Sequence, residues 1–123
     1  NLQNAILEQA NLTQANLSHA DLQGCNAQNA GLVRAQLAAA NLVNANVQGA
    51  NFSGASLQAA QCQSANLQGA GLFGADLAGA NLESATLLET DLRATCLKSA
   101  LFNADTQWPP DFDPQLVAGI GGE

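Results

Sequence analysis

The sequence has little charge, few aromatic side chains, and neither methionine nor tyrosine. Of its 123 residues, 11% are charged and 4% are aromatic, whereas roughly 25% are charged in an average globular domain. Asn, Gln, Ser and Gly must therefore cover most of the surface. The net charge of −7 argues against nucleic acid or an anionic membrane as a partner, because phosphate groups would be repelled. A basic partner remains open.

No segment that would target or anchor a chain is visible in these residues. No apolar run approaches the roughly 20 residues that cross a bilayer, and no signal or transit peptide is visible. The sequence starts at Asn1, which is typical of a trimmed or processed chain. Its three cysteines cannot all pair with one another, and their spacing matches no metal signature. We expect reduced thiols and a cytoplasmic location, with a lumenal or periplasmic one as the alternative if a targeting segment has been removed.

What the sequence does contain is a five-residue repeat over residues 1–103. An apolar residue, usually leucine, returns at every fifth position from Leu2 to Phe102, and we name this position the central slot. Alanine is the commonest residue in the −2 slot, two positions earlier, and Asn or Asp is the commonest in the −1 slot. The +1 and +2 slots are rich in Gln, Ser and Gly. Departures in the central slot are Ala27, Val47, Phe52, Cys62 and Phe102, and those in the −2 slot are Cys25, Thr90 and Thr95.

A period of five fits neither an α-helix nor a flat strand. Five helical residues turn about 140° beyond a full turn, and an odd step along a strand moves the side chain to the other face. The −2 and central slots are two residues apart, however, so they share one side of an extended stretch. A constant bend in the +1 and +2 slots, where six glycines occupy the +2 slot, would turn this apolar side into a coil. Such coils must stack to bury their core.

Quintets such as Ala10-Asn11-Leu12-Thr13-Gln14 and Ala75-Asp76-Leu77-Ala78-Gly79 resemble the pentapeptide-repeat family. The resemblance implies an all-β solenoid, a right-handed quadrilateral β-helix with four pentapeptides per coil. Residues 1–103 then form about five coils, and residues 104–123 form a C-terminal capping segment. The implied 20-residue register stacks Phe52 among leucines, and we expect its large ring to be offset by the smaller Val47 and Cys62.

The C-terminal segment departs from the repeat, because Ala104 arrives one position early. Asp113-Pro114 is typical of a helix N-cap and first helical residue. Leu116, Val117 and Ile120 follow at helical spacing and Gly119 could end the helix. We expect Trp108, Phe112 and Leu116 to cover the last coil. The stretch 106–114 also resembles the C-terminal segment of many cyanobacterial members of the family.

The N-terminal end has no cap in the sequence, since repeats begin at Asn1 and Leu2. An open coil exposes its core and its unpaired strand edges. Either upstream sequence is missing, or this coil stacks on another molecule. End-to-end or dimeric self-association is therefore expected.

Side chains with chemical potential are few, and we assign none of them to a catalytic, cofactor or metal site. Ser18, His19 and Asp21 are close in sequence, but neighbouring residues of an extended chain point in different directions. The recurrent Asn and Asp residues are expected to bond to local backbone and to one another in ladders, not to a metal. Cys25 and Cys62 fall in inward slots, whereas Cys96 falls in the −1 slot, where an inert exposed thiol is favoured over a reactive one.

The remaining candidates are the three basic residues and two outward apolar residues. Arg34, Arg93 and Lys98 are too few for a nucleic-acid patch. Phe73 and Leu88 would mark a contact surface only if they clustered. No phosphate-binding or dinucleotide-binding glycine motif is present.

These observations favour a non-enzymatic structural or protein-interaction module, with another protein as its partner and no cofactor. The alternative is an inhibitor of DNA gyrase that mimics DNA. The resemblance to the pentapeptide-repeat family implies this possibility, because its quinolone-resistance members are acidic rods that resemble duplex DNA. The sign of the charge fits that alternative. The coils carry six acidic residues against three basic ones, however, and these form no ladder: Glu8, Asp21, Asp76, Glu83, Glu89 and Asp91.

Overall fold

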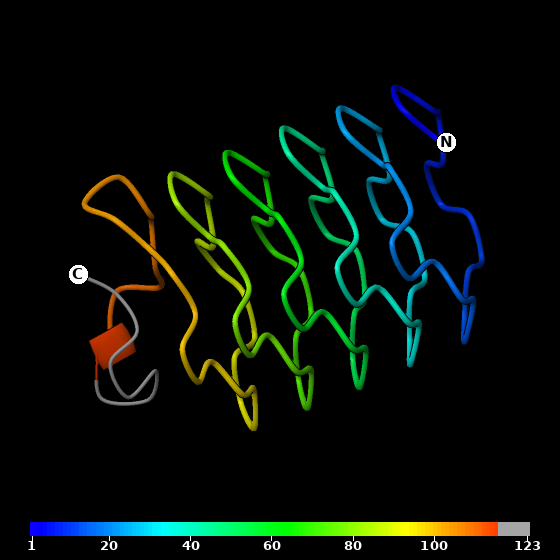
Figure 1. The fold of residues 1–123 in the computed structure, drawn as a ribbon. Coiled ribbons are helices and arrows are strands. Elements are labelled where there is room, and N and C mark those ends of the chain that lie inside the picture. The colour runs from blue at the N-terminus through cyan, green and yellow to red at the C-terminus, as the bar shows by residue number, and fades with distance from the viewer. Residues whose placement is uncertain (116–123) are drawn as a thin grey trace.

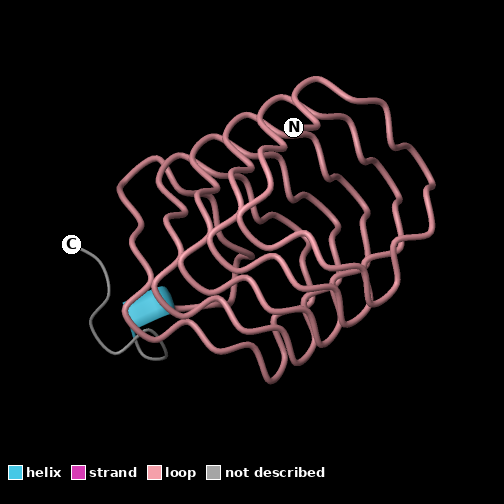
Figure 2. Cartoon of the chain, turned by 45° about the vertical axis from the view of Figure 1, so that its right-hand side comes forward, coloured by secondary structure: helices cyan, strands magenta, loops and turns pink. Residues whose placement is uncertain are grey.

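The chain winds into a four-sided β-helix whose coils stack along one axis (Figures 1 and 2). This computed structural model describes residues 1–115. Parallel pairs join residues twenty positions apart, from Ile6 with Asn26 to Asn81 with Leu101. Four pentapeptides therefore complete one coil, as the family resemblance implied. Residues 1–101 make five coils, which rise about 4.8 Å each.

Each side of a coil within residues 1–101 is very short and pairs with the next coil through an isolated parallel bridge. The pairing residue on each side is a single residue in the −1 slot. A helix begins at Pro114, and its described part is Pro114–Gln115. The Oδ1 atom of Asp113 accepts a hydrogen bond from the Gln115 N–H at 3.0 Å, which confirms Asp113 as the N-cap. The predicted continuation through Leu116, Val117, Gly119 and Ile120 lies outside the described residues.

Backbone hydrogen bonds explain why the coils hold together. In the pentapeptide 36–40, the Leu37 N–H donates to the Ser56 carbonyl at 2.7 Å, and the Ala39 N–H donates to the Gln58 carbonyl at 2.9 Å. The Ala40 N–H closes the turn on the Leu37 carbonyl at 3.0 Å. The Gln36 N–H donates to the Ala15 carbonyl of the preceding coil at 2.8 Å. The same pattern recurs between residues 26 and 82, where only the N–H of the +1 slot lacks a backbone acceptor.

The Asn or Asp of the −1 slot satisfies this remaining donor. Asn41 Oδ1 accepts from the Val43 N–H at 3.0 Å, and Asp76 Oδ1 accepts from the Ala78 N–H at 3.0 Å. Every other Asn or Asp in this slot through Asp91 makes the same bond two residues ahead. The preference for Asn and Asp is therefore a capping preference, which is met on twelve of the twenty sides of the five coils.

Replacing Asn41 by alanine is expected to lower the free energy of unfolding by about 1 kcal/mol, because the Val43 N–H then loses its acceptor. Replacing Asn41 by aspartate retains an oxygen in the same place and is expected to cost less. Urea denaturation followed by circular dichroism measures both changes. Equal loss in the two variants would contradict the capping role.

The bend predicted in the +1 and +2 slots is confirmed at every coil. Each +2 residue from Asn4 to Ser99 has a positive φ, between 56° and 71°, as the third position of a type II turn requires. Gly49 shows why glycine is favoured here for a second reason. A Cβ atom at Gly49 would collide with the side chain of Asn29, which leans over it from the preceding coil.

The core is built from the central and −2 slots, as predicted. From Leu22 onward these residues are buried, and the exceptions are Thr90, Leu92 and Thr95 near the C-terminal end, together with Phe102. Phe52 is fully buried, and Val47 and Cys62 are each 1% exposed. Large and small residues alternate along the chain in a close-packed interior.

The register breaks after Phe102, as expected, and the structure accommodates the break with one additional residue. Thr86 pairs with Gln107, which is twenty-one residues away. Ala104 lies in an exposed turn, and Thr106 takes the inward position instead. The Thr106 hydroxyl donates to the Leu82 carbonyl at 2.9 Å, and its N–H closes the turn on Asn103. One residue is thus inserted, because this buried hydroxyl finds an acceptor inside.

Two of the three side chains expected over the last coil, Trp108 and Phe112, pack against the core. Trp108 meets Phe102 edge-to-face with ring centroids 5.4 Å apart, and it stacks on Phe112 at 5.3 Å. The third expected contact, from Leu116, lies outside the described residues.

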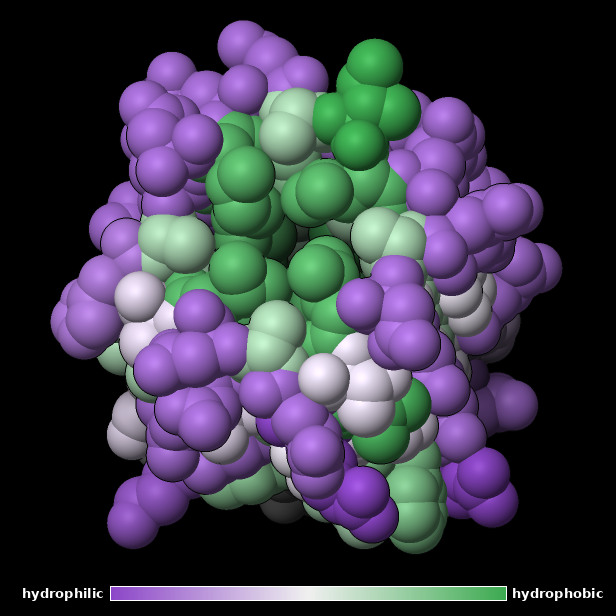
Figure 3. Space-filling view, turned by 90° about the vertical axis from the view of Figure 1, so that its right-hand side faces the viewer, coloured by the Kyte–Doolittle hydropathy of each residue, from purple (hydrophilic) through white to green (hydrophobic). Residues whose placement is uncertain are grey.

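The first coil leaves an apolar surface at the opposite end. Leu2, Leu7, Leu12 and Leu17 are only partly buried, and Ile6 is 79% exposed. Figure 3 looks onto this end and shows apolar side chains surrounded by a polar rim.

Candidate interaction surfaces

The outward side chains form four edges that run along the solenoid, one at each turn. We number edges 1 to 4 by their first turn, at residues 3–4, 8–9, 13–14 and 18–19, and each edge continues every twenty residues. Turn residues of successive coils therefore form columns along the solenoid axis, and neighbours within a column are about 4.8 Å apart. These columns, and the −1 residues between them, make up the solvent-facing surface.

Charge is segregated among these edges. The turn residues of edges 1 and 2 within the five coils include Glu8, Glu83 and Glu89 and no base. All three bases of the chain lie on the other two edges, with Arg34 and Arg93 on edge 3 and Lys98 on edge 4. No acidic residue occupies a turn position of edges 3 and 4. Sequence reasoning missed this arrangement, although numbering the residues modulo twenty would have shown it.

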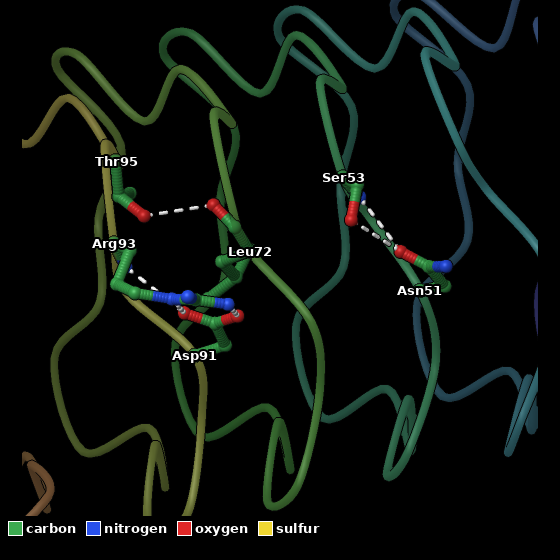
Figure 4. A network of polar contacts seen from close by, with 6 residues as sticks. All are labelled: Asn51, Ser53, Leu72, Asp91, Arg93 and Thr95. Atoms are coloured by element: carbon green, nitrogen blue, oxygen red, sulfur yellow. Dashed lines mark hydrogen bonds and ion pairs between the residues drawn. The ribbon is translucent and has the colours of Figure 1, made fainter.

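Arg93 on edge 3 makes two contacts, and Figure 4 shows the one with Asp91. Its Nε atom donates to Asp91 Oδ1 at 2.9 Å, and its Nη2 atom donates to Asp91 Oδ2 at 2.8 Å. The guanidinium also lies 5.4 Å from the ring centroid of Phe73 in the preceding coil, a cation–π distance. Side-chain hydrogen bonds from Arg93, together with its backbone N–H, lower the pKa of Asp91 to about 2.

Neighbouring polar contacts in Figure 4 belong to the repeat itself. Asn51 and Ser53 occupy the same two columns as Asp91 and Arg93, and the Ser53 hydroxyl donates to Asn51 Oδ1 at 2.7 Å. The Thr95 hydroxyl donates to the Leu72 carbonyl at 2.7 Å. Thr95 can therefore replace alanine in the −2 slot, because its hydroxyl has a backbone acceptor in the preceding coil.

The two outward apolar residues do not form a patch. Phe73 is 50% exposed on edge 3, whereas Leu88 is half-buried on edge 2. They lie on different columns, so neither reinforces the other. The ring of Phe73 instead packs against the guanidinium of Arg93.

A hollow of about 430 Å³ lies where edge 3 meets the C-terminal segment. Its walls are mainly apolar, with one base and one acid: Thr90, Leu92, Arg93, Pro109, Pro110, Asp111 and Phe112. Arg93 is already engaged by Asp91. Among the described lining residues we find no nucleophile paired with a base.

Ser18, His19 and Asp21 are not assembled into a triad. The Asp21 carboxylate accepts hydrogen bonds from the Gln3 Nε2 atom at 2.8 Å and from the Gln23 N–H. His19 is a turn residue with a φ of 64°. No hydrogen bond within residues 1–115 joins His19 to Ser18 or Asp21.

The Asn and Asp residues bond locally, as expected, but the predicted ladders of Asn bonded to Asn are wrong. Within residues 1–101, hydrogen bonds between side chains of different coils instead run from Gln to acids: Gln3 to Asp21, Gln58 to Asp76 and Gln68 to Glu89. The Oδ1 atoms of these residues accept instead from the backbone N–H groups of their own turns. Within residues 1–115, no cluster of three His, Cys, Asp or Glu side chains could hold a metal ion.

The cysteines lie where the repeat places them. Cys25 and Cys62 are buried, and Cys96 is exposed. Burial raises the pKa of the Cys25 thiol, and it raises the pKa of the Cys62 thiol to about 12. A thiol with a raised pKa presents very little thiolate near neutral pH.

We therefore expect one thiol, Cys96, to react with a thiol reagent in the folded protein, and all three to react after denaturation. Titration with Ellman's reagent at pH 8 measures both numbers. Because the pKa of Cys62 is higher in the folded state, its ionisation also destabilises the fold as the pH rises from about 9 toward 12. A second thiol that reacts quickly under native conditions would contradict this burial.

No helix within residues 1–115 is both long enough and apolar enough to cross a membrane.

Comparisons with known proteins agree with this architecture. A family model described as pentapeptide repeats matches residues 1–32, 35–72 and 65–103, with 8 copies. We found no match to the chain among curated proteins. Several solved structures are similar to it.

The first is that of Rfr23, a pentapeptide repeat protein from the cyanobacterium Cyanothece 51142, with 37% identity over 80% of this chain and a TM-score of 0.50. The chain spans 64% of the length of Rfr23. A pentapeptide repeat protein of the Arabidopsis thaliana thylakoid lumen is 29% identical over 68% of this chain and 66% of its own, with a TM-score of 0.50. The protein alr5209 from Nostoc PCC 7120 is 34% identical over 96% of this chain and 84% of its own, with a TM-score of 0.39.

The family match covers most of the chain, and the twenty-residue pairing gives it the expected four sides. The fold is the right-handed quadrilateral β-helix that the sequence resemblance implied. The chain therefore belongs to the pentapeptide-repeat family.

Proposed function

We propose that this protein is a non-enzymatic interaction module that binds another protein through its outer edges. The observation that carries the proposal is the contrast between an apolar interior and a regular polar surface. Alanine and leucine fill the axis of the solenoid, and the outward residues form regular polar columns with charge separated between edges. A rigid surface of this kind suits recognition of a macromolecule.

Affinity capture from a cyanobacterial lysate tests this function, with the folded protein as bait. The matched control is the Ala60→Asp variant, which we expect to be unfolded. A protein that is enriched by the folded bait only, and that then binds the purified bait in calorimetry, supports the module. Failure to enrich any protein, or turnover of a small molecule by the purified chain, would argue against it.

Inhibition of DNA gyrase is the second candidate, because the net charge of −7 has the sign of DNA. The columns weigh against it. Within residues 1–103 no column carries acidic residues in two successive coils, whereas duplex DNA presents phosphates at regular short spacing. We expect no inhibition of gyrase supercoiling at micromolar protein. Clear inhibition would reverse the order of the two candidates.

We further propose that a polypeptide of residues 1–123 associates with a second copy through its first coil. Its apolar leucines and the exposed Ile6 support this contact. Trp108 and Phe112 cover the other end, so the pairing is head-to-head and closed. Light scattering should show a dimer that the double variant Ile6→Asp/Leu7→Asp reduces to a monomer. A parent chain that remains monomeric at high concentration would rule out this contact.

We place the protein in a reducing compartment such as the cytoplasm. All three cysteines are free thiols, and two of them are buried, a usage typical of reducing compartments. Subcellular fractionation with an antibody against the chain tests the location. Recovery in a lumenal or periplasmic fraction would contradict it.

A further inference from the structure

We propose that edge 3 is the docking surface for an acidic, extended segment of the partner protein, with carboxylates about four residues apart and an apolar side chain between them. The proposal rests on the interaction module proposed above and names the chemistry of its partner. The surface consists of Val33, Arg34, Gly54, Phe73, Gly74 and Arg93.

Charge complementarity is the first reason for an acidic partner. The chain carries ten acidic residues and only three basic ones, yet two of the three bases share edge 3. No acid lies among the turn residues of edge 3 or of the neighbouring edge 4, where Lys98 is located. Like-charge repulsion elsewhere on the molecule would direct an acidic segment toward this side.

Unused hydrogen-bond donors are the second reason. Arg34 is exposed, and no residue within 1–115 forms an ion pair with it. Arg93 uses Nε and Nη2 for Asp91, which leaves the Nη1 group and one hydrogen of Nη2 available for another carboxylate. Asp91 and the ring of Phe73 fix the guanidinium, so binding would immobilise few additional rotamers.

The shape of edge 3 sets the spacing of the partner. Arg34 and Arg93 lie on coils three apart, about 14 Å along the axis at the usual strand spacing. An extended peptide covers this distance in about four residues. Gly54 and Gly74 lack side chains between the two arginines, and Phe73, which is 50% exposed, offers an apolar contact next to them. The side chain of Arg34 leans toward this strip, with its Cγ atom close to Gly54.

The test uses the synthetic peptide Gly-Gly-Glu-Gly-Leu-Gly-Glu-Gly-Gly as probe and amide chemical shifts of the labelled protein as readout. We expect shifts confined to the turns of edge 3, and an affinity at least tenfold higher than for the same peptide with glutamine in place of glutamate. The variants Arg34→Gln and Arg93→Gln should each weaken binding about fivefold. The matched control Glu83→Gln, on edge 1, should not weaken it.

Three results would overturn the proposal. The first is the absence of shifts at millimolar peptide, or equal binding of the glutamine peptide. The second is a set of concentration-dependent shifts on edges 1 and 3 without any peptide, which would make a second copy the occupant. The third is a captured partner protein that the double variant Arg34→Gln/Arg93→Gln retains as well as the parent does. That result would leave the proposed function intact while it excludes this surface.

Discussion

Replacing Phe52 by alanine is expected to lower the free energy of unfolding by about 3–5 kcal/mol. The ring is fully buried, and it lies in the column of Leu12, Leu32, Leu72 and Leu92. The coils above and below are tied by backbone hydrogen bonds on every side. They cannot collapse into the space that the ring leaves, so the cost includes a residual cavity.

The neighbouring residues make this cavity worse. Val47 is small for the central slot of the same coil, and Cys62 occupies the opposite column one coil later. Both are 1% exposed, and we expect their small volumes to offset that of the ring. Phe52→Leu restores the usual residue of the repeat, but it leaves a smaller gap and should cost about 1 kcal/mol.

The matched control is Phe73→Ala, because Phe73 is the same residue type one coil later and is 50% exposed. It should cost less than about 1 kcal/mol. Guanidinium denaturation followed by circular dichroism measures all three variants. If the Phe52→Ala protein were as stable as the Phe73→Ala protein, the inward placement of Phe52 would be refuted.

Most of this architecture could be predicted because it depends on which residues must avoid water. Leucine and alanine repeat with period five, and only a backbone that bends after each quintet keeps both inside. The confirmed positions of Phe52, Trp108 and Phe112 follow from the same reasoning. The number of sides came from the family resemblance, since periodicity alone leaves the bend angle open.

Features that depend on single hydrogen bonds were harder to predict. Asn41 caps the Val43 N–H, and the need for that cap is evident only when the other backbone donors of the quintet have been paired. The shift at Asn103 has a similar origin. Thr106 occupies the inward position, where its hydroxyl donates to the Leu82 carbonyl. These residues are 24 positions apart, so no local sequence pattern predicts the contact.

Candidate site residues required the register as well as the pattern. Arg34 and Arg93 are 59 residues apart in the sequence and share edge 3 only because 20 residues complete one coil. The pairing of Arg93 with Asp91 is local and follows the same two-residue step as the caps. Its contact with Phe73 is not local, and it also follows from the coil.

Replacing Ala60 by aspartate is expected to unfold the protein at neutral pH. Ala60 is in the −2 slot, is 1% exposed and faces an axis filled with alanine and leucine. A carboxylate there would have no partner, and an unpaired buried charge costs several kcal/mol. That penalty takes most of the 5–15 kcal/mol that stabilises a typical domain.

The adjacent Ala59 provides a control with the same substitution. It lies in the exposed +2 slot with a φ of 58°, a conformation that aspartate tolerates better than most residues. The Ala59→Asp protein should therefore remain folded, with a melting temperature close to that of the parent. Thermal unfolding followed by circular dichroism compares the two variants.

The pH dependence of the Ala60→Asp variant distinguishes a buried charge from simple overpacking. Burial raises the pKa of a carboxyl group above its unfolded value, so the neutral form is favoured in the folded state. The penalty therefore grows as the pH rises above about 4 and shrinks as the pH falls toward it. We expect partial recovery of structure near pH 4, whereas Ala60→Leu should show no such recovery. If Ala60→Asp and Ala59→Asp unfolded alike, the −2 slot would not face the axis, and the four-sided coil would lose its physical basis.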